Sequence, residues 1–126
     1  MLHREGSQLN FLCRQARKLI RRGETLQLRE MLCKAMADCP DAAQPHNLMG
    51  ILLESQGDIP GAMRHYRAAC ALDPTYRPAS YNLDRLGNLF GDQGASPAYD
   101  EGCPMGAGRF HHIAYDRSGE GRLASV

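Results

Sequence analysis

The residues that could hold a metal ion gather near the C-terminus, where Cys103 precedes the adjacent pair His111 and His112. Thiolate and imidazole are the ligands that zinc prefers in proteins. Two adjacent histidines do not share one face of a helix or strand, however, and the chain contains no Cys-x-x-Cys pair. The spacing is therefore weak support for a metal site, which stays a minor alternative, and we expect no cofactor.

The residue types used in catalysis lack the motifs that would support them. The stretch M-G-A-G at 105–108 is too short for a phosphate-binding loop and lacks the strand-then-helix setting that such a loop needs. No Ser/His/Asp, Cys/His or paired-carboxylate arrangement occurs in a supporting motif. His46 and His65 are more typical of packing or surface positions. We therefore expect a protein that is not an enzyme.

Positive charge is concentrated at the N-terminal end of the chain. Residues 1–37 carry eight Lys/Arg against three Glu, a net charge of +5, which leaves −4 for the rest of a chain whose net charge is +1. Clustered cations are enough for phosphate contact. The aromatic side chains that would stack on bases are absent from this segment except for Phe11. A nucleic-acid-contacting accessory protein that uses this basic segment is therefore the alternative function and not the favoured one.

Length and composition fit a single domain with a tail, since the chain has 126 residues and 43% of them are apolar. The start lacks the charged-then-apolar form of a signal peptide. No apolar run approaches the ~20 residues that a membrane span needs. The cysteines, five in number, are best interpreted as reduced thiols. We therefore expect a cytoplasmic protein that does not enter the membrane.

The chain repeats itself at a shift of 34 residues, which indicates paired helices. The shift aligns Ala16 with Gly50, Gly23 with Gly57, Ala35 with Ala69 and Pro40 with Pro74. Gly57 is suited to a left-handed helix end, and Asp58 is suited to cap the next helix. Ala62, Tyr66 and Ala69 share one helix face and alternate small with large side chains, as close helix packing requires. The pattern predicts helices near 7–22, 25–38, 43–56, 59–72 and 76–90.

Residues 46–74, H-N-L-M-G-I-L-L…A-M-R-H-Y…A…P, resemble a tetratricopeptide repeat (TPR). The positions that match its pattern are Gly50, Ala62, Tyr66, Ala69 and Pro74, while His46, Met49 and Leu53 replace its Trp, Leu and Tyr. Residues 9–42 form a degenerate first copy, and one closing helix follows the second. The resemblance implies an all-α fold for residues 1–90: a short right-handed α-solenoid of antiparallel helix pairs with a concave face.

The same resemblance implies that the first helix of each pair lines that concave face and binds a partner there. The alignment places the groove at Asn10, Cys13, Arg17, Arg21, Gln44, Asn47, Ile51, Ser55, Pro78, Tyr81, Arg85 and Leu89. We expect a small adaptor or scaffold that binds a protein or peptide, with Arg17 and Arg85 holding acidic groups. The alternative is that these arginines are ordinary solvated helix positions.

Composition changes at Gly91, since residues 91–126 hold seven glycines and two prolines and show no helical period. Such a sequence favours a mobile C-terminal tail that folding does not need, and removal of everything after Gly94 is then expected to be harmless. The alternative is that the tail, with its aromatic stretch 109–116, docks on its own helices or on a neighbour. Self-association through the tail or the ends of the solenoid stays open.

Overall fold

The computed structural model describes residues 2–87 and 96–105 of the chain, and these residues form five helices and no strand. The helices are α1 (Leu2–Arg22), α2 (Thr25–Asp38), α3 (Ala43–Ser55), α4 (Ile59–Leu72) and α5 (Arg77–Gly87). The all-α prediction is confirmed, and the bounds of α2, α3 and α4 lie within one residue of those expected. Helix α1 begins five residues earlier than expected, and the expected end of the last helix at 88–90 lies outside the described residues.

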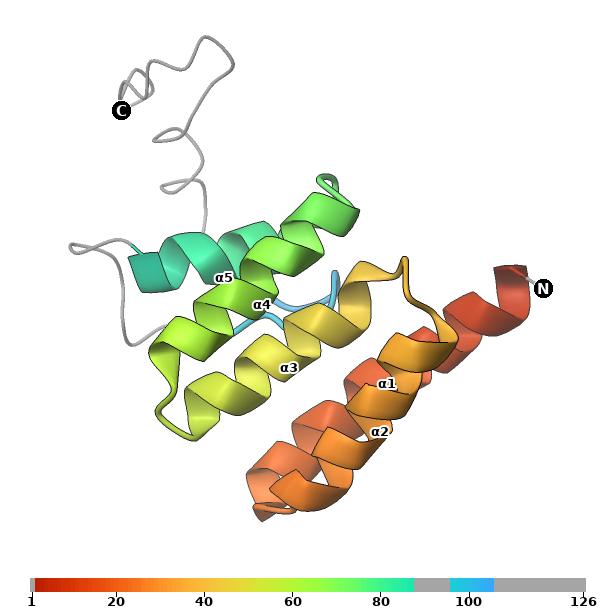
Figure 1. Cartoon of the computed structure of the whole chain (residues 1–126), viewed down its shortest axis with the longest axis horizontal. Coiled ribbons are helices and arrows are strands. Elements are labelled where there is room, and N and C mark those ends of the chain that lie inside the picture. The colour runs from red at the N-terminus through yellow and green to blue at the C-terminus, as the bar shows by residue number, and fades with distance from the viewer. Residues whose placement is uncertain (1, 88–95, 106–126) are drawn as a thin grey trace, which may run out of the picture.

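Helix α3 is the centre of the fold and contacts each of the other four helices. Successive helices run antiparallel and lie side by side (Figure 1). The sequence of α3 explains its central place, because Leu48 to Leu52 are all buried and leave no polar face. A helix that is apolar on every side must be covered on every side. None of the helices in the described part of the chain combines the length and apolar character needed to cross a membrane.

The ends of the helices follow the expected local chemistry. Gly23 and Gly57 adopt the left-handed backbone conformation, with φ of 75° and 86°, after α1 and α3. Glycine reaches this conformation without the steric cost that a Cβ atom adds. The side chain of Asp58 accepts a hydrogen bond from Gly61 N at 2.9 Å and so caps the start of α4. The predicted turn between α3 and α4, at Gly57 and Asp58, is therefore confirmed.

The contact between α3 and α4 depends on Gly50 and Tyr66. Tyr66 is completely buried together with Ala62 and Ala69, which confirms the predicted packing face of α4. A Cβ atom added at Gly50 would lie 2.5 Å from Tyr66 Cε1, far inside van der Waals contact. Only glycine therefore lets the two helices approach this closely without a shift of the tyrosine ring.

Two histidines also meet across the interface of α3 and α4. His46 Nδ1 lies 3.3 Å from His65 Nδ1, and the rings are stacked with their centroids 5.5 Å apart. Burial lowers the pKa of both side chains. The charges of His46, Arg64 and Arg29 lower the pKa of His65 further. One neutral histidine can donate to the other at this distance, whereas two charged rings would repel.

Acidification should therefore destabilise the protein through this pair. The folded pKa values lie below that of an unfolded histidine, about 6.5, so the unfolded chain binds more protons as pH falls through that value. The free energy of unfolding should fall below about pH 6.5, and the loss should end below the folded pKa values. Because both rings are partly exposed, the slope should be only a fraction of the ~1.4 kcal/mol per pH unit that a fully buried histidine can give. Urea unfolding at several pH values measures the slope. The double variant His46→Gln/His65→Gln should show a shallower slope, and an unchanged slope would contradict the expectation.

After the helices the chain returns to them. Residues 96–105, drawn in blue, pass behind α3 and α4 in Figure 1. Ala98 is completely buried and Cys103 is nearly so. Tyr99 packs against the main hydrophobic core. This part of the Gly-rich region is thus docked on the helices, while the rest of it, including the aromatic stretch 109–116, lies outside the described residues.

Candidate functional site

Residues 96–103 lie on side chains from three helices, namely α1, α3 and α5. We call this surface the inner face and define it by Arg17 of α1, Asn47 of α3 and Asn82 of α5, which contact the docked residues directly. It is the face that the sequence assigned to a partner. In this structure a segment of the chain itself covers it.

Two asparagines hold the main chain of Ala98. Asn82 Oδ1 accepts a hydrogen bond from Ala98 N at 2.8 Å, and Asn82 Nδ2 donates one to Ala98 O at 2.9 Å. Asn47 Nδ2 donates a second bond to the same carbonyl at 3.0 Å. Both asparagines are completely buried, and Asn82 Nδ2 also donates to Asn47 Oδ1 at 2.9 Å. These bonds go to the main chain alone, so any selection between side chains has to come from other contacts.

The ion pair of Arg85 and Glu54 fixes the orientation of the Asn82 amide. Arg85 makes two bonds of 2.8 Å to the carboxylate of Glu54, and Arg85 NH2 lies 3.3 Å from Asn82 Oδ1. The hydroxyl of Tyr66 donates to Glu54 Oε1 at 2.8 Å. Because Arg85 only donates, it forces the oxygen of the Asn82 amide toward itself and toward Ala98 N. The amide nitrogen then points at the carbonyl of Ala98.

The pKa values of this buried group agree with a paired arginine and carboxylate. Burial acts to lower the pKa of Arg85, but the hydrogen bonds and charge of Glu54 outweigh it and hold the pKa above its usual value. Burial, and then the charge of Glu54, raises the pKa of Tyr66. The arginine therefore stays charged and the phenol stays neutral at physiological pH.

The side chain of Arg17 holds the next part of the segment. Its guanidinium carbon lies 4.8 Å from the centroid of the Tyr99 ring, and its NH2 group lies 2.7 Å from Cys103 Sγ. The segment turns between these two residues, where Cys103 N donates to Asp100 O at 3.1 Å. Arg17 therefore spans both ends of a tight turn through a cation–π contact and a hydrogen bond.

The structure places the groove residues predicted from the sequence in three groups. Arg17 and Asn47 contact the docked segment, and Asn10, Cys13 and Gln44 line a cavity beside it. The third group holds the rest of the described groove residues. In it, Ile51 and Pro78 are buried among the helices, and the hydroxyl of Ser55 donates to Leu52 O. Tyr81 is half-buried and Arg21 is exposed. Leu89 lies outside the described residues.

The prediction that Arg85 is available to bind an acidic partner is wrong. Its side chain is only 2% exposed, and Glu54 already occupies both terminal nitrogens. No local pattern indicates this partner, because Glu54 lies 31 residues away near the end of α3. Asn82 was missed for a different reason: the 34-residue shift aligns it with Leu48 and selects Tyr81 in its place.

The cysteine of the possible metal site has partners within the protein. Cys103 Sγ contacts Arg17 and accepts a hydrogen bond from Tyr99 N at 3.3 Å. His111 and His112 lie outside the described residues. Within 2–87 and 96–105, no group of three His, Cys, Asp or Glu side chains is arranged to hold a metal ion.

The chain matches no family model, no curated protein and no solved structure. The resemblance to the tetratricopeptide repeat therefore stays a prediction from residues 9–90.

Proposed function

We propose that this protein is a non-catalytic peptide-binding adaptor, a short TPR-like solenoid whose inner face takes an extended segment of another protein in place of its own residues 96–103. The observation that carries the proposal is the pair of asparagines that bond both main-chain groups of Ala98. Buried amides aimed at a backbone are suited to hold a peptide whose side chains are read elsewhere.

The docked residues indicate what the partner segment should look like. Ala98 is completely buried, so its place accepts only a small side chain. The next position carries Tyr99, whose ring lies on Arg17. Acidic residues follow at 100 and 101. A segment with a small residue followed by an aromatic one therefore reproduces the contacts of Ala98 and Tyr99. The cation that such a segment meets on this face is Arg17, through the aromatic ring, and not Arg85.

Binding of such a partner requires the chain's own segment to leave the face. Eight residues join Gly87 to Ser96, and a short tether of this kind gives an effective concentration of about a millimolar or more. A free peptide must exceed that concentration to displace the segment from the wild-type chain. The variant Ala98→Lys should remove the competitor, because a lysine does not fit the buried position of Ala98.

The test measures fluorescence anisotropy with a labelled synthetic peptide of residues 96–104, S-P-A-Y-D-E-G-C-P. The Ala98→Lys chain should bind it roughly tenfold or more tightly than the wild-type chain does, because the tethered segment no longer competes. A second peptide with lysine in place of its alanine is the matched control and should not bind. Equal binding of both peptides, or of one peptide to both chains, would show that the inner face is not a peptide site.

A further inference from the structure

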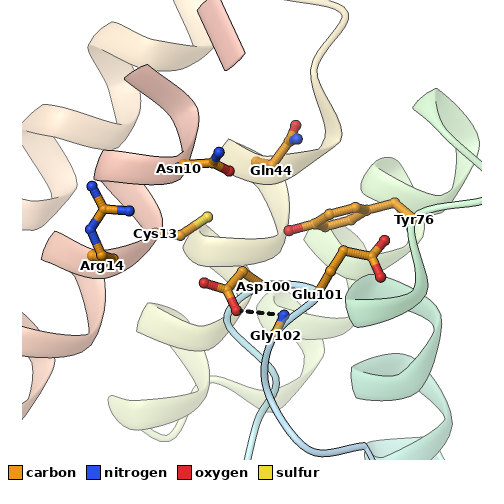
Figure 2. Close-up of a pocket in the computed structure, with 8 residues that line it drawn as sticks. All are labelled: Asn10, Cys13, Arg14, Gln44, Tyr76, Asp100, Glu101 and Gly102. Carbon is orange, nitrogen blue, oxygen red and sulfur yellow. Dashed lines mark hydrogen bonds between the residues drawn. The ribbon is translucent and has the colours of Figure 1, made fainter. Parts of the chain in front are cut away.

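A second feature of the inner face is a cavity of about 270 Å³ that the docked segment completes. Helix α1 supplies one wall, the start of α3 another, and residues 100–102 of the docked turn close the opposite side (Figure 2). Its lining residues are Asn10, Cys13, Arg14, Gln44, Tyr76, Asp100, Glu101 and Gly102. The cavity lies beside the backbone contacts of Ala98 and uses none of the residues that make them.

The hydroxyl of Tyr76 points into this cavity, where the thiol of Cys13 interacts with it weakly and no described residue gives it a hydrogen bond of ordinary geometry (Figure 2). The hydroxyl oxygen is buried, and the side chain as a whole is only 6% exposed. A buried hydroxyl without a partner costs free energy, and native proteins contain few of them. An unpaired hydroxyl that faces a cavity indicates a polar ligand atom at that position.

The charged side chains around the cavity indicate the sign of the charge that a ligand would carry. Asp100 and Glu101 supply two carboxylates from the docked turn, and the exposed Arg14 supplies one cation. The guanidinium of Arg14 lies 6.0 Å from the centroid of the Phe11 ring. Burial first, then the interaction with Cys13 and the charges of Asp100 and Glu101, raise the pKa of Tyr76, so the hydroxyl stays neutral and can accept as well as donate.

Covalent and metal chemistry do not fit these groups. Burial, followed by the charge of Asp100, raises the pKa of Cys13 to about 12, so its sulfur stays a thiol and is a poor nucleophile. No three acidic, thiol or imidazole groups of the described residues are placed to hold a metal ion. What remains is a set of oxygen acceptors with a net negative charge: two carboxylates, two amides and one phenol.

We propose that this cavity binds a primary ammonium group, either a free amine or a lysine side chain. An ammonium offers three donors and one positive charge. Tyr76 Oη and the carboxylates of Asp100 and Glu101 accept from it, and the amide oxygens of Asn10 and Gln44 lie at the other side of the cavity. The proposal needs only the docked segment seen in this structure and does not rest on the binding of a partner peptide.

Titration of the full-length wild-type chain with cadaverine and with Nα-acetyl-lysine methylamide, followed by NMR, tests this proposal. The side-chain amide signals of Asn10 and Gln44 should shift and saturate at millimolar amine. The lysine derivative with an acetylated side chain has no charge and should cause no shift. Cadaverine alone would identify the ligand as a free amine, and shifts with both probes would extend it to a peptide lysine. Saturation by propionate instead, or no shift with either amine, would overturn the proposal.

The variant Tyr76→Phe separates a binding role from a structural one. Loss of a hydrogen bond to the ammonium should weaken binding about tenfold. The melting temperature should stay the same or rise, because the substitution removes an unpaired buried hydroxyl and keeps the ring. Tyr81→Phe, in α5 and outside the cavity, is the matched control and should leave amine binding unchanged. Unchanged affinity in Tyr76→Phe, or an equal loss in Tyr81→Phe, would also overturn the proposal.

Discussion

Replacement of Arg85 by glutamate should unfold the protein. The side chain of Arg85 is buried and makes both of its terminal bonds to Glu54, so the variant would set two carboxylates against each other in the interior. Loss of one partner from a buried ion pair costs about 3–5 kcal/mol, and repulsion adds to this. Domains are stable by only about 5–15 kcal/mol in total. Helical circular dichroism at room temperature should therefore be largely lost.

The matched control is Arg17→Glu, which changes the same residue type on the same face. Arg17 is half-buried and contacts Tyr99 and Cys103, with no carboxylate partner among the described residues, so its reversal should loosen the docked segment and leave the helices folded. The double variant Glu54→Gln/Arg85→Met should recover part of the stability, because it removes both charges together. If Arg85→Glu melts at the same temperature as Arg17→Glu, the buried pair does not hold the fold.

The helices could be predicted from the sequence because their signals are local. Gly57 and Asp58 mark a helix end and a helix start within two residues, and the face of Ala62, Tyr66 and Ala69 repeats at helical spacing. The early start of α1 had no such signal. Residues 2–6 are mostly polar and lack the apolar period, and nothing in them forbids a helix that the rest of α1 has already begun.

The candidate site could be predicted only in part, because its contacts join distant segments. Arg17 and Asn47, which the helical period places on one face of α1 and of α3, do contact the docked segment. The composition of residues 91–126 averages over many glycines and hides the short stretch that contains Ala98 and Tyr99. The hydrogen-bond partners of that stretch are two asparagines of α3 and α5, and no local pattern in residues 91–126 indicates partners on distant helices.

The docked segment and Asn82 should be strongly coupled in their effect on stability. In the full chain, Asn82→Ala leaves Ala98 N, Ala98 O and Asn47 Oδ1 with fewer partners inside the protein. Unpaired buried groups cost about 1–3 kcal/mol each, so we expect a loss of about 3–5 kcal/mol. A chain that ends at Gly94 should also be less stable, contrary to the expectation from composition. In that chain water reaches Asn82, and its replacement by alanine should cost less than about 1 kcal/mol.

Urea unfolding of the four proteins, with and without the segment and with and without Asn82, gives the coupling free energy directly. We expect at least about 2 kcal/mol, since residues in one hydrogen-bond network are not additive. Asn10→Ala is the matched control, because this exposed amide lies on α1 near the same segment and makes no bond to Ala98. Its cycle with the truncation should give a value near zero. A coupling near zero for Asn82 as well would mean that the bonds to Ala98 contribute nothing to the free energy of unfolding in solution. That result would contradict the proposal that the inner face binds a peptide backbone.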